Sequence, residues 1–181
     1  MRRLFKYCGR LTPVRNLAVL VAFFTQIGLS TSWAADLEAP RGDVLLTISG
    51  DITQTNIGDT AEFDYDMIAA LPVTVVVTST PWTDGPTEFT GAALADLLDA
   101  VGAQGSVIKA VALNGYIVNI PLVDARETGA TIAYLRDGKR MTVRNKGPLW
   151  IIYPFDNLTG DQDVYFNRAI WQLRYLEVGE D

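Results

Sequence analysis

The sequence predicts an α+β fold with mixed, mostly antiparallel sheets and few short helices. Segments rich in β-branched residues dominate the chain, and the clearest of them is Val73–Thr78 (VTVVVT). Two pairs, Asn114-Gly115 and Asp137-Gly138, separate such segments, and pairs of this kind are the strongest short-range signal for a β-hairpin. Only Gly91–Val101 has the clear apolar spacing of a helix. Hairpins with few helices favour antiparallel pairing over a doubly wound sheet.

Each element in the first half has its own local signal. Val44–Ser49 (VLLTIS) predicts a strand, because it is rich in β-branched residues and a Gly-Asp pair follows it. Asp64 is the predicted N-cap of a short helix that ends at Leu71, since Pro72 follows. The unbroken β-branched run of Val73–Thr78 predicts a strand that is buried on both faces.

In the second half the helix is followed by further strands. The helix over Gly91–Val101 has leucines on one face and aspartates on the other, and Gly102 is placed to end it. The remaining predicted strands are Val107–Leu113, Tyr116–Ile120, Thr131–Leu135, Arg140–Val143, Pro148–Tyr153, Val164–Trp171 and Leu173–Val178.

Residues 1–34 have the features of a secretory signal. Five basic and no acidic residues precede or flank the apolar run Leu17–Leu29, which is shorter than the roughly 20 residues that a membrane span needs. Small residues at Ser32 and Ala34 suit signal peptidase, so we expect cleavage after Ala34 or Ala35. The expected product is a single periplasmic domain over residues 35–181, and the alternative is a retained N-terminal anchor.

The charge balance argues against nucleic acid as a partner. The whole chain has 15 basic and 21 acidic residues, a net charge of −6. Loss of the signal would leave 10 basic and 21 acidic residues, a net charge of −11. Such a domain repels phosphates instead of releasing their counterions. Its net charge also predicts a soluble monomer.

Residues 35–181 contain no cysteine and no histidine, because the only cysteine of the chain is Cys8. The usual zinc, haem and iron–sulfur sites need thiolate or imidazole ligands. Nucleophilic catalysis by Cys–His or Ser–His pairs is excluded for the same reason. A cofactor in this domain would therefore be held without a thiolate-bound metal.

Four segments together resemble the oxidoreductase molybdopterin-binding domain, the sulfite oxidase fold. They are FTGAALADLLDAVG (89–102), ALNGYIVNIPL (112–122), IAYLRDGKRM (132–141) and KGPLWIIYP (146–154). They follow one another in the family's order, and the resemblance extends from about residue 73 to residue 178. It implies a sulfite-oxidase-type fold for residues 35–181.

Two positions depart from the catalytic members of that family. In those members a cysteine after the central strand binds molybdenum, whereas Thr78–Trp82 (TSTPW) has no thiol here. A hydroxyl is a poor substitute for a soft thiolate ligand. Catalytic members also have an arginine after Gly-Pro-Leu, where this chain has Trp150. Both departures point away from molybdenum redox chemistry, and both are compatible with binding a flat heterocycle.

The chain is also similar to a small periplasmic branch of this fold that lacks the ligand cysteine. Members of that branch bind reduced pterins without molybdenum. They relay pterin occupancy to the periplasmic domain of a membrane diguanylate cyclase/phosphodiesterase, which makes and degrades cyclic di-GMP. The resemblance therefore implies a non-catalytic, pterin-binding signalling protein with a reduced monapterin-like ligand and no metal.

Six residues are predicted to contact the pterin. Aromatic planes can stack on its rings and polar groups can bind its amide edge, and the predicted residues are Trp82, Tyr116, Arg126, Arg144, Lys146 and Trp150. Each has a structural alternative: a tryptophan can be core, as we expect for Trp171, and Arg126 can pair with a neighbouring carboxylate at the surface.

Two other functions remain open. The first is a molybdopterin-dependent oxidoreductase with a non-cysteine metal ligand, which predicts stoichiometric molybdenum in the purified protein. The second is a structural module that has lost its ligand, which predicts no ligand-dependent change in thermal stability.

Overall fold

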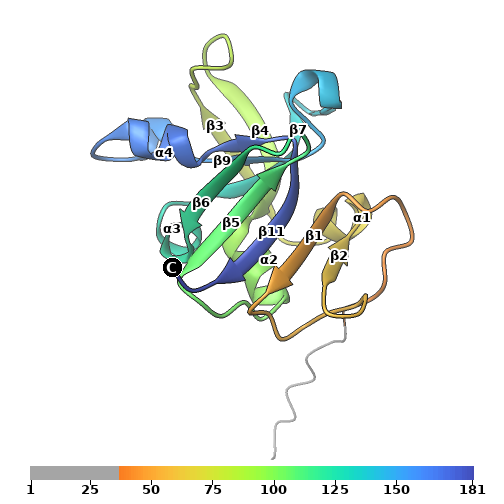
Figure 1. The fold of residues 1–181 in the computed structure, drawn as a ribbon. Coiled ribbons are helices and arrows are strands. Elements are labelled where there is room, and N and C mark those ends of the chain that lie inside the picture. The colour runs from red at the N-terminus through yellow and green to blue at the C-terminus, as the bar shows by residue number, and fades with distance from the viewer. Residues whose placement is uncertain (1–36) are drawn as a thin grey trace, which may run out of the picture. The chain divides into compact units, whose positions relative to one another are not determined.

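The computed structural model describes residues 37–181, so the predicted secretory signal at 1–34 lies outside the described residues. Residues 37–181 form an α+β domain with mostly antiparallel sheets and few short helices, which confirms the predicted class (Figure 1). The strands are β1 (Leu46–Gly50), β2 (Ala61–Phe63), β3 (Val73–Thr78), β4 (Thr87–Ala93), β5 (Val107–Ala112), β6 (Ile117–Pro121), β7 (Thr131–Arg136), β8 (Lys139–Arg140), β9 (Trp150–Ile152), β10 (Ile170–Trp171) and β11 (Leu173–Gly179). The helices are α1 (Tyr65–Ala69), α2 (Leu94–Ala100), α3 (Leu122–Glu127) and α4 (Gln162–Arg168), with 3₁₀ turns η1 (Val143–Asn145) and η2 (Phe155–Asn157).

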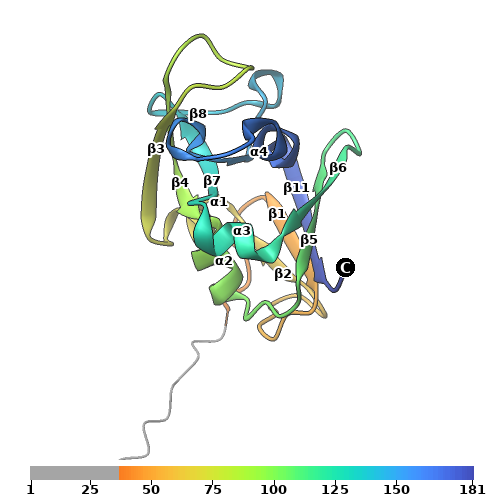
Figure 2. The same ribbon diagram turned by 90° about the vertical axis from the view of Figure 1, so that its left-hand side faces the viewer.

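The strands form two sheets that face each other (Figure 2). One sheet has the order β2-β1-β11-β5-β6, and β1 and β11 are its only parallel pair among the described strands. The other has the order β10-β9-β7-β4-β3, with β8 paired to β7. The core between them is apolar, and its largest fully buried side chains are Trp150, Tyr153, Phe63, Phe89 and Phe155.

The chain passes from one sheet to the other at Gln172, between β10 and β11. Gln172 has a left-handed backbone with φ of 56°. Its amide N–H donates to the carbonyl of Lys146 at 3.0 Å, and its own carbonyl accepts from the N–H of Leu113 at 2.8 Å. This crossing joins the end of the β5–β6 hairpin to the segment that precedes β9, so residues far apart in sequence meet at one end of the domain.

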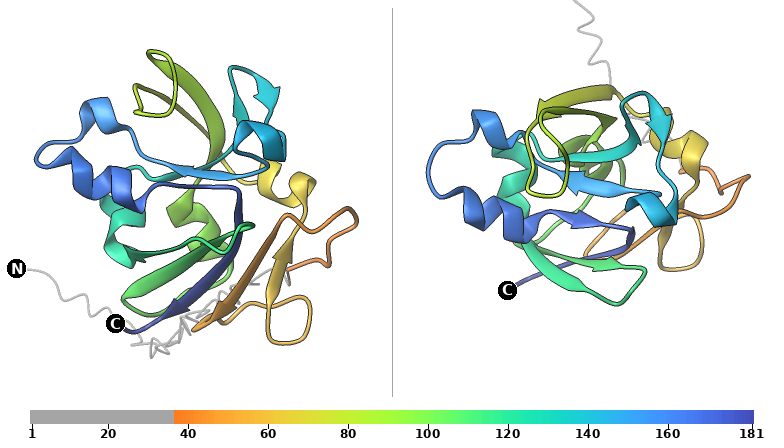
Figure 3. Two further views of the ribbon diagram at one scale, coloured as in Figure 1. Left: turned by 45° about the horizontal axis from the view of Figure 1, so that its top comes forward. Right: turned by 90° about the horizontal axis from the view of Figure 1, so that it is seen from above.

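The two predicted hairpin turns are present. Gly115 has φ of 83° between β5 and β6, and Asp137 and Gly138 have φ of 50° and 71° between β7 and β8. At Asp137-Gly138, positive φ at both central residues matches the type I′ turn, whose twist suits a hairpin. In the β5–β6 turn only Gly115 has positive φ. The hairpins β3–β4 and β7–β8 project from the same end of the domain (Figure 3).

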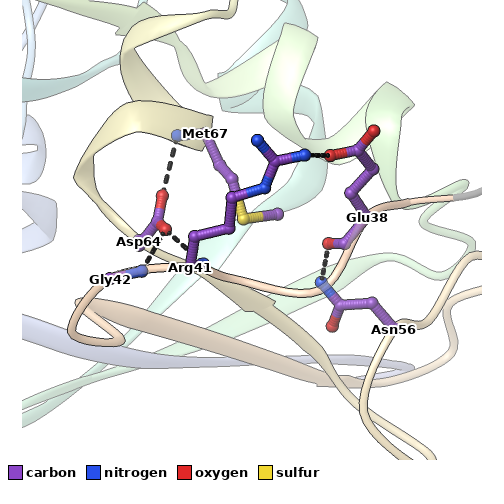
Figure 4. A network of polar contacts seen from close by, with 6 residues as sticks. All are labelled: Glu38, Arg41, Gly42, Asn56, Asp64 and Met67. Atoms are coloured by element: carbon purple, nitrogen blue, oxygen red, sulfur yellow. Dashed lines mark hydrogen bonds and ion pairs between the residues drawn. The ribbon is translucent and has the colours of Figure 1, made fainter.

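Helix α1 begins at Asp64, as predicted. One carboxylate oxygen of Asp64 accepts from the N–H of Met67 at 2.9 Å, and the other accepts from the N–H groups of Arg41 and Gly42 at 2.8 Å each (Figure 4). These backbone hydrogen bonds, chiefly those from Met67 and Gly42, hold the pKa of Asp64 below its ordinary value. The buried Asp64 therefore caps the helix and fastens the segment before β1 to it.

Replacing Asp64 with alanine is expected to lower the free energy of unfolding by about 2–3 kcal/mol, because the cap is lost and buried N–H groups lose their acceptor. Asp64→Asn keeps the shape but loses the charge, so its deficit depends on pH. The charged contribution is present in full above the ordinary carboxyl pKa of about 3.9 and is lost as the pH falls through the lower pKa of the folded state. Urea unfolding of both variants between pH 3 and pH 7 measures this, and a deficit that persists unchanged at the acid end would contradict it.

Four predicted elements were wrong in type or position. Of the strand predicted over Arg140–Val143 only Arg140 lies in a strand, because the chain leaves β8 there and Val143 begins η1. The helix predicted over Gly91–Val101 begins only at Leu94, because Gly91 lies in β4. A Cβ at Gly91 would lie 2.1 Å from the carbonyl oxygen of Ile132, so the close approach of β7 excludes a side chain there. The strand predicted over Val164–Trp171 is mostly helix α4, which Asp161 caps by accepting from the N–H of Asp163.

The fourth error concerns β3, whose β-branched run was predicted to be buried on both faces. The strand lies at the edge of its sheet, and Val73, Val75 and Val77 are 63%, 54% and 56% exposed. Continuous β-branching therefore does not distinguish a central strand from an edge strand with one open face. Strand β4 was not predicted, and neither were the shorter elements β2 and α3. Among residues 37–181, no helix is long and apolar enough to cross a membrane.

Candidate functional site

Four aromatic side chains gather at the end of the domain where the β3–β4 loop, β10 and α4 meet. Trp82 in the loop lies edge-on to Trp171 of β10, with 5.3 Å between ring centroids, and edge-on to Phe166 of α4 at 5.9 Å. Behind them Trp150 of β9 lies 6.0 Å from Trp82 and 5.9 Å from Trp171. Edge-to-face contacts of this kind are favourable and fix the ring orientations.

A cavity of about 280 Å³ opens beside this aromatic cluster. Trp82, Phe166 and Trp171 form its aromatic walls. Small and polar residues complete the lining: Ala112, Asn114, Tyr116, Asn167 and Ala169. The lining contains no charged side chain, so the cavity suits a neutral, flat ligand with some hydrogen-bonding capacity.

The polar groups of the cavity come from the β5–β6 turn and from α4. The Oδ1 of Asn114 accepts from the N–H of Tyr116 at 3.0 Å, which fixes the turn and leaves the Asn114 amide NH₂ as a donor. Tyr116 is 52% exposed and lies at the mouth. Asn167 adds a second amide from α4. An amide offers both a donor and an acceptor, which matches the mixed edge of a lactam-type heterocycle.

The six predicted ligand residues do not all meet at this cavity. Trp82 and Tyr116 line it. Lys146 lies beside it, because its Nζ is 4.2 Å from the ring centroid of Trp171. Lys146 has a left-handed backbone with φ of 67°, which turns the chain after η1. The Lys146 ammonium thus brings one positive charge next to an aromatic wall of the cavity without lining the cavity itself.

Arg126 and Arg144 lie away from the cavity. The Nη2 of Arg126 donates to Asp99 of α2 at 2.8 Å, in an ion pair whose side chains are about half exposed. This is the surface pairing that the sequence left open, although the partner is Asp99 rather than a neighbour in sequence. Arg144 is exposed on η1 and does not line this cavity.

Trp150 is fully buried and is part of the core. It lies edge-on to Phe89 at 5.3 Å between centroids, so its ring supports the tryptophans that line the cavity. Its Nε1–H has no acceptor within residues 37–181. A ligand that touches Trp82 and Trp171 would rest on a wall that Trp150 holds in place.

Helix α4 is fastened to the domain by a partly buried ion pair. The Nη1 of Arg168 donates to both carboxylate oxygens of Asp124, at 2.8 and 3.1 Å, and the hydroxyl of Tyr153 donates to the same carboxylate at 3.2 Å. Burial, and then the charge of Asp124, raise the pKa of Tyr153 well above its usual value. Because α4 contributes Phe166 and Asn167, this contact positions one side of the cavity.

The hydroxyls of the β3–β4 loop are engaged locally. The Oγ1 atoms of Thr80 and Thr83 lie 2.9 Å apart, and the Thr80 hydroxyl accepts from the N–H of Trp82 at 3.1 Å. The N–H of Ser79 donates to Asp156 at 2.8 Å. These contacts hold the loop in the conformation that presents Trp82. Among residues 37–181, no cluster of three or more His, Cys, Asp or Glu side chains is placed to hold a metal ion.

A larger cavity of about 400 Å³ lies between α1 and the β7–β8 hairpin, but it suits a flat ligand less well. Its aromatic residues are Tyr65 and Tyr134, and the guanidinium of Arg140 already covers the Tyr65 ring, with Cζ 3.4 Å from the centroid. Carboxylates of Asp43 and Asp66 line it as well. Desolvation, and then the neighbouring Tyr65, raise the pKa of Tyr134. The smaller, uncharged cavity is therefore the better candidate site.

Sequence reasoning missed four aromatic or amide residues of the cavity. Trp171 was predicted to be core, Asn114 was predicted only as part of a hairpin turn, and Phe166 and Asn167 were predicted in a strand that is a helix. The density of aromatic residues between Tyr165 and Trp171 was the available signal. No protein family model and no curated protein matches this chain.

Proposed function

We propose that residues 35–181 are a pterin-binding protein that reports ligand occupancy to a partner and performs no bond chemistry. The observation that supports this most strongly is the uncharged cavity walled by Trp82, Trp171 and Phe166 and edged by amide groups. A pterin is a flat, two-ring heterocycle with an amide-like edge. Aromatic walls favour its faces, and Asn114 and Asn167 offer groups that can bind its edge.

The size of the cavity favours a simple pterin over a full molybdenum cofactor. Ligand cavities for drug-sized molecules measure roughly 300–1,000 Å³, and this one is about 280 Å³. A two-ring ligand with a short side chain suits that volume, and Tyr116 at the mouth is placed to contact the side chain. A metal-bearing pyranopterin with its phosphate would require more space and a counter-charge inside the cavity.

The resemblance to the sulfite oxidase fold adds to this proposal. Under it, residues 35–181 adopt that fold, and the loop at Thr78–Trp82, where catalytic members have their metal ligand, presents a tryptophan instead. The two-sheet α+β architecture is compatible with it. The periplasmic location and the membrane diguanylate cyclase/phosphodiesterase partner belong to the same proposal, as does a reduced monapterin-like ligand.

Occupancy can be transmitted through elements that the ligand would touch. The cavity joins the β5–β6 turn, the β3–β4 loop and α4, which come from three separate parts of the chain. A ligand that binds all three more tightly in one arrangement shifts the protein toward that arrangement. Binding could thus change the surface around Tyr116 without any chemical step.

Calorimetric titration of the purified, ligand-free protein with a tetrahydropterin under anaerobic conditions tests the proposal. We expect one site per chain and a melting temperature that rises with ligand concentration, as binding to the folded state requires. Affinity should change little between about pH 6 and pH 8, because the lining has no charged side chain and the chain has no histidine. Guanosine serves as a control of similar size and polarity.

A protein that shows neither heat of binding nor a thermal shift with any reduced or oxidised pterin would contradict the proposal and favour the structural-module alternative. Purification with stoichiometric molybdenum would instead favour the molybdopterin-dependent oxidoreductase. In that case a group other than a thiolate would have to bind the metal. For the hydroxyls of Thr80 and Thr83 to do so, their present hydrogen bond would have to break.

A further inference from the structure

The longest edge strand of the domain is unprotected. Edge strands offer unpaired N–H and C=O groups, and proteins usually shorten them, bend them or place lysine or proline in them. The other sheet edges are protected in these ways, since β2 has three residues, β10 has two and β6 ends at Pro121. β3 has six residues, with no charge and no proline.

β3 is also regular along its whole length. All six residues pair in unbroken register with β4, from Val73 opposite Ala92 to Thr78 opposite Thr87. The irregularity in β4, between Thr90 and Gly91, affects only its pairing with β7. In an antiparallel pair alternate residues direct their backbone groups to each side, so half of β3 presents free hydrogen-bonding groups at the outer edge of the domain (Figure 2).

The outward side chains of β3 are apolar. Val73, Val75 and Val77 are all more than half exposed, while Val76 and Thr78 point into the core. An exposed row of valines next to an open backbone edge is the arrangement that strand addition uses, in which main-chain hydrogen bonds give affinity and alternate side chains add contacts.

We propose that β3 pairs with β3 of a second copy of this chain to form a two-fold symmetric dimer. Side chains that face each other across an antiparallel seam must lie on the same face of the sheet. Pairing Val75 with Val75 of the other copy satisfies this, and it places Val73 opposite Val77 in both directions. The three outward valines of each copy then face one another in three pairs on the same surface of the joined sheet.

The charge distribution selects this surface for self-association. Residues 67–83 contain no charged side chain, although charged residues make up 20% of the chain. Two copies of an acidic domain repel each other, but this seam brings no carboxylate against another. Glu88, opposite Val77 on β4, is one strand behind the seam. The net charge of the domain predicted a monomer. That argument rests on repulsion between charged surfaces, and β3 carries no charge.

The dimer should be weak and dependent on concentration. Stable interfaces involve about 20–30 residues on each side, whereas β3 has six. Sodium chloride should strengthen the association, because it screens the repulsion between two negatively charged domains. This inference does not depend on a ligand, so it can fail or succeed independently of pterin binding.

Sedimentation equilibrium of the full chain between about 10 µM and 1 mM tests the dimer, since millimolar dissociation constants still populate it at the upper end. We expect the average mass to rise from 19.8 kDa toward twice that value. Val75→Lys should remain monomeric at every concentration. Val143→Lys is the matched control, because Val143 is also 54% exposed but lies on η1, and it should behave like the wild type.

Cysteine cross-linking tests the register. In a Cys8→Ser background the chain has no other cysteine, and opposed residues across an antiparallel seam lie within the Cα separation that a disulfide allows. Val75→Cys should oxidise to a covalent dimer, and Val73→Cys should link to Val77→Cys in a mixture but not to itself. A monomer at 1 mM, with Val75→Cys linking no faster than Val143→Cys, would overturn the proposal and leave β3 as an edge for a different protein.

Discussion

Replacing Trp82 with alanine is expected to weaken pterin binding by about 5- to 150-fold. Stacking of a flat heterocycle on an aromatic side chain is worth roughly 1–3 kcal/mol when measured by alanine substitution, and 1.4 kcal/mol corresponds to a factor of ten. Trp82 lines the cavity and is held by edge contacts to Trp171 and Phe166. Trp171→Ala should have an effect of similar size, and Trp82→Phe a smaller one.

The control for this prediction is Arg126→Ala. Arg126 was a predicted ligand residue, but it is paired with Asp99 at the surface and does not line the cavity. Its removal should leave the affinity within about twofold of the wild type, because exposed ion pairs contribute little and this one lies apart from the site. Calorimetry on the four variants, with thermal melting to show that each is folded, measures the difference. Equal affinities in all of them would contradict the assignment of the cavity.

Asp124→Ala is expected to lower the free energy of unfolding by about 2–3 kcal/mol. The variant leaves the buried Tyr153 hydroxyl without its acceptor, and it leaves the Arg168 guanidinium, which is 28% exposed, without its partner. Asp124 has a side-chain exposure of 7%, and it accepts from both Arg168 and the Tyr153 hydroxyl. The variant should also bind pterin more weakly than its stability alone implies, because α4, with Phe166 and Asn167, loses its anchor.

The same helix α3 supplies a matched comparison. Arg126 also forms an ion pair, at the same 2.8 Å distance, but its side chain and that of Asp99 are 49% and 59% exposed. Arg126→Ala should therefore change the free energy of unfolding by less than about 1 kcal/mol. Urea unfolding of both variants gives the two values. Similar losses for the partly buried and the exposed pair would show that Asp124 does not anchor α4.

The class of the fold could be predicted from local signals. The Asn114-Gly115 and Asp137-Gly138 pairs predicted tight hairpins, and both hairpins lie where they were expected, with positive φ at Gly115, Asp137 and Gly138. Asp64 was recognisable as a cap, because its side chain competes for the free N–H groups at the start of a helix. Turn and cap signals depend on only a few neighbouring residues, so they can be recognised in the sequence alone.

The errors have tertiary causes. Gly91 was predicted to be helical, but it lies in strand β4, where the close approach of β7 leaves no room for a side chain. The apolar residues between Val164 and Trp171 are compatible with a strand or a helix. The hydrogen bond from the N–H of Asp163 to the Asp161 side chain favours the start of a helix there. The exposure of Val73, Val75 and Val77 depends on the position of β3 in the sheet, which no local pattern contains.

The candidate site was predictable only in part for the same reason. Trp82 and Tyr116 could be selected because each is next to a turn, where side chains reach the surface. Arg126 was predicted to contact the ligand because of its place in a sequence motif. In the structure it pairs instead with Asp99 of another helix, a contact that the local sequence does not indicate. Trp171 lines the cavity because it directly precedes the crossing between sheets at Gln172, and Phe166 lines it because α4 packs beside the β3–β4 loop.

The central claim is that this domain holds a simple pterin without molybdenum. The most direct test is to purify the protein from its own compartment, denature it, identify the released small molecules by fluorescence and mass spectrometry, and assay molybdenum in the same sample. We expect a reduced, monapterin-like pterin at up to one molecule per chain and no stoichiometric molybdenum. A molybdenum-bearing pyranopterin would contradict the account, and so would a protein that releases nothing and does not bind added pterin.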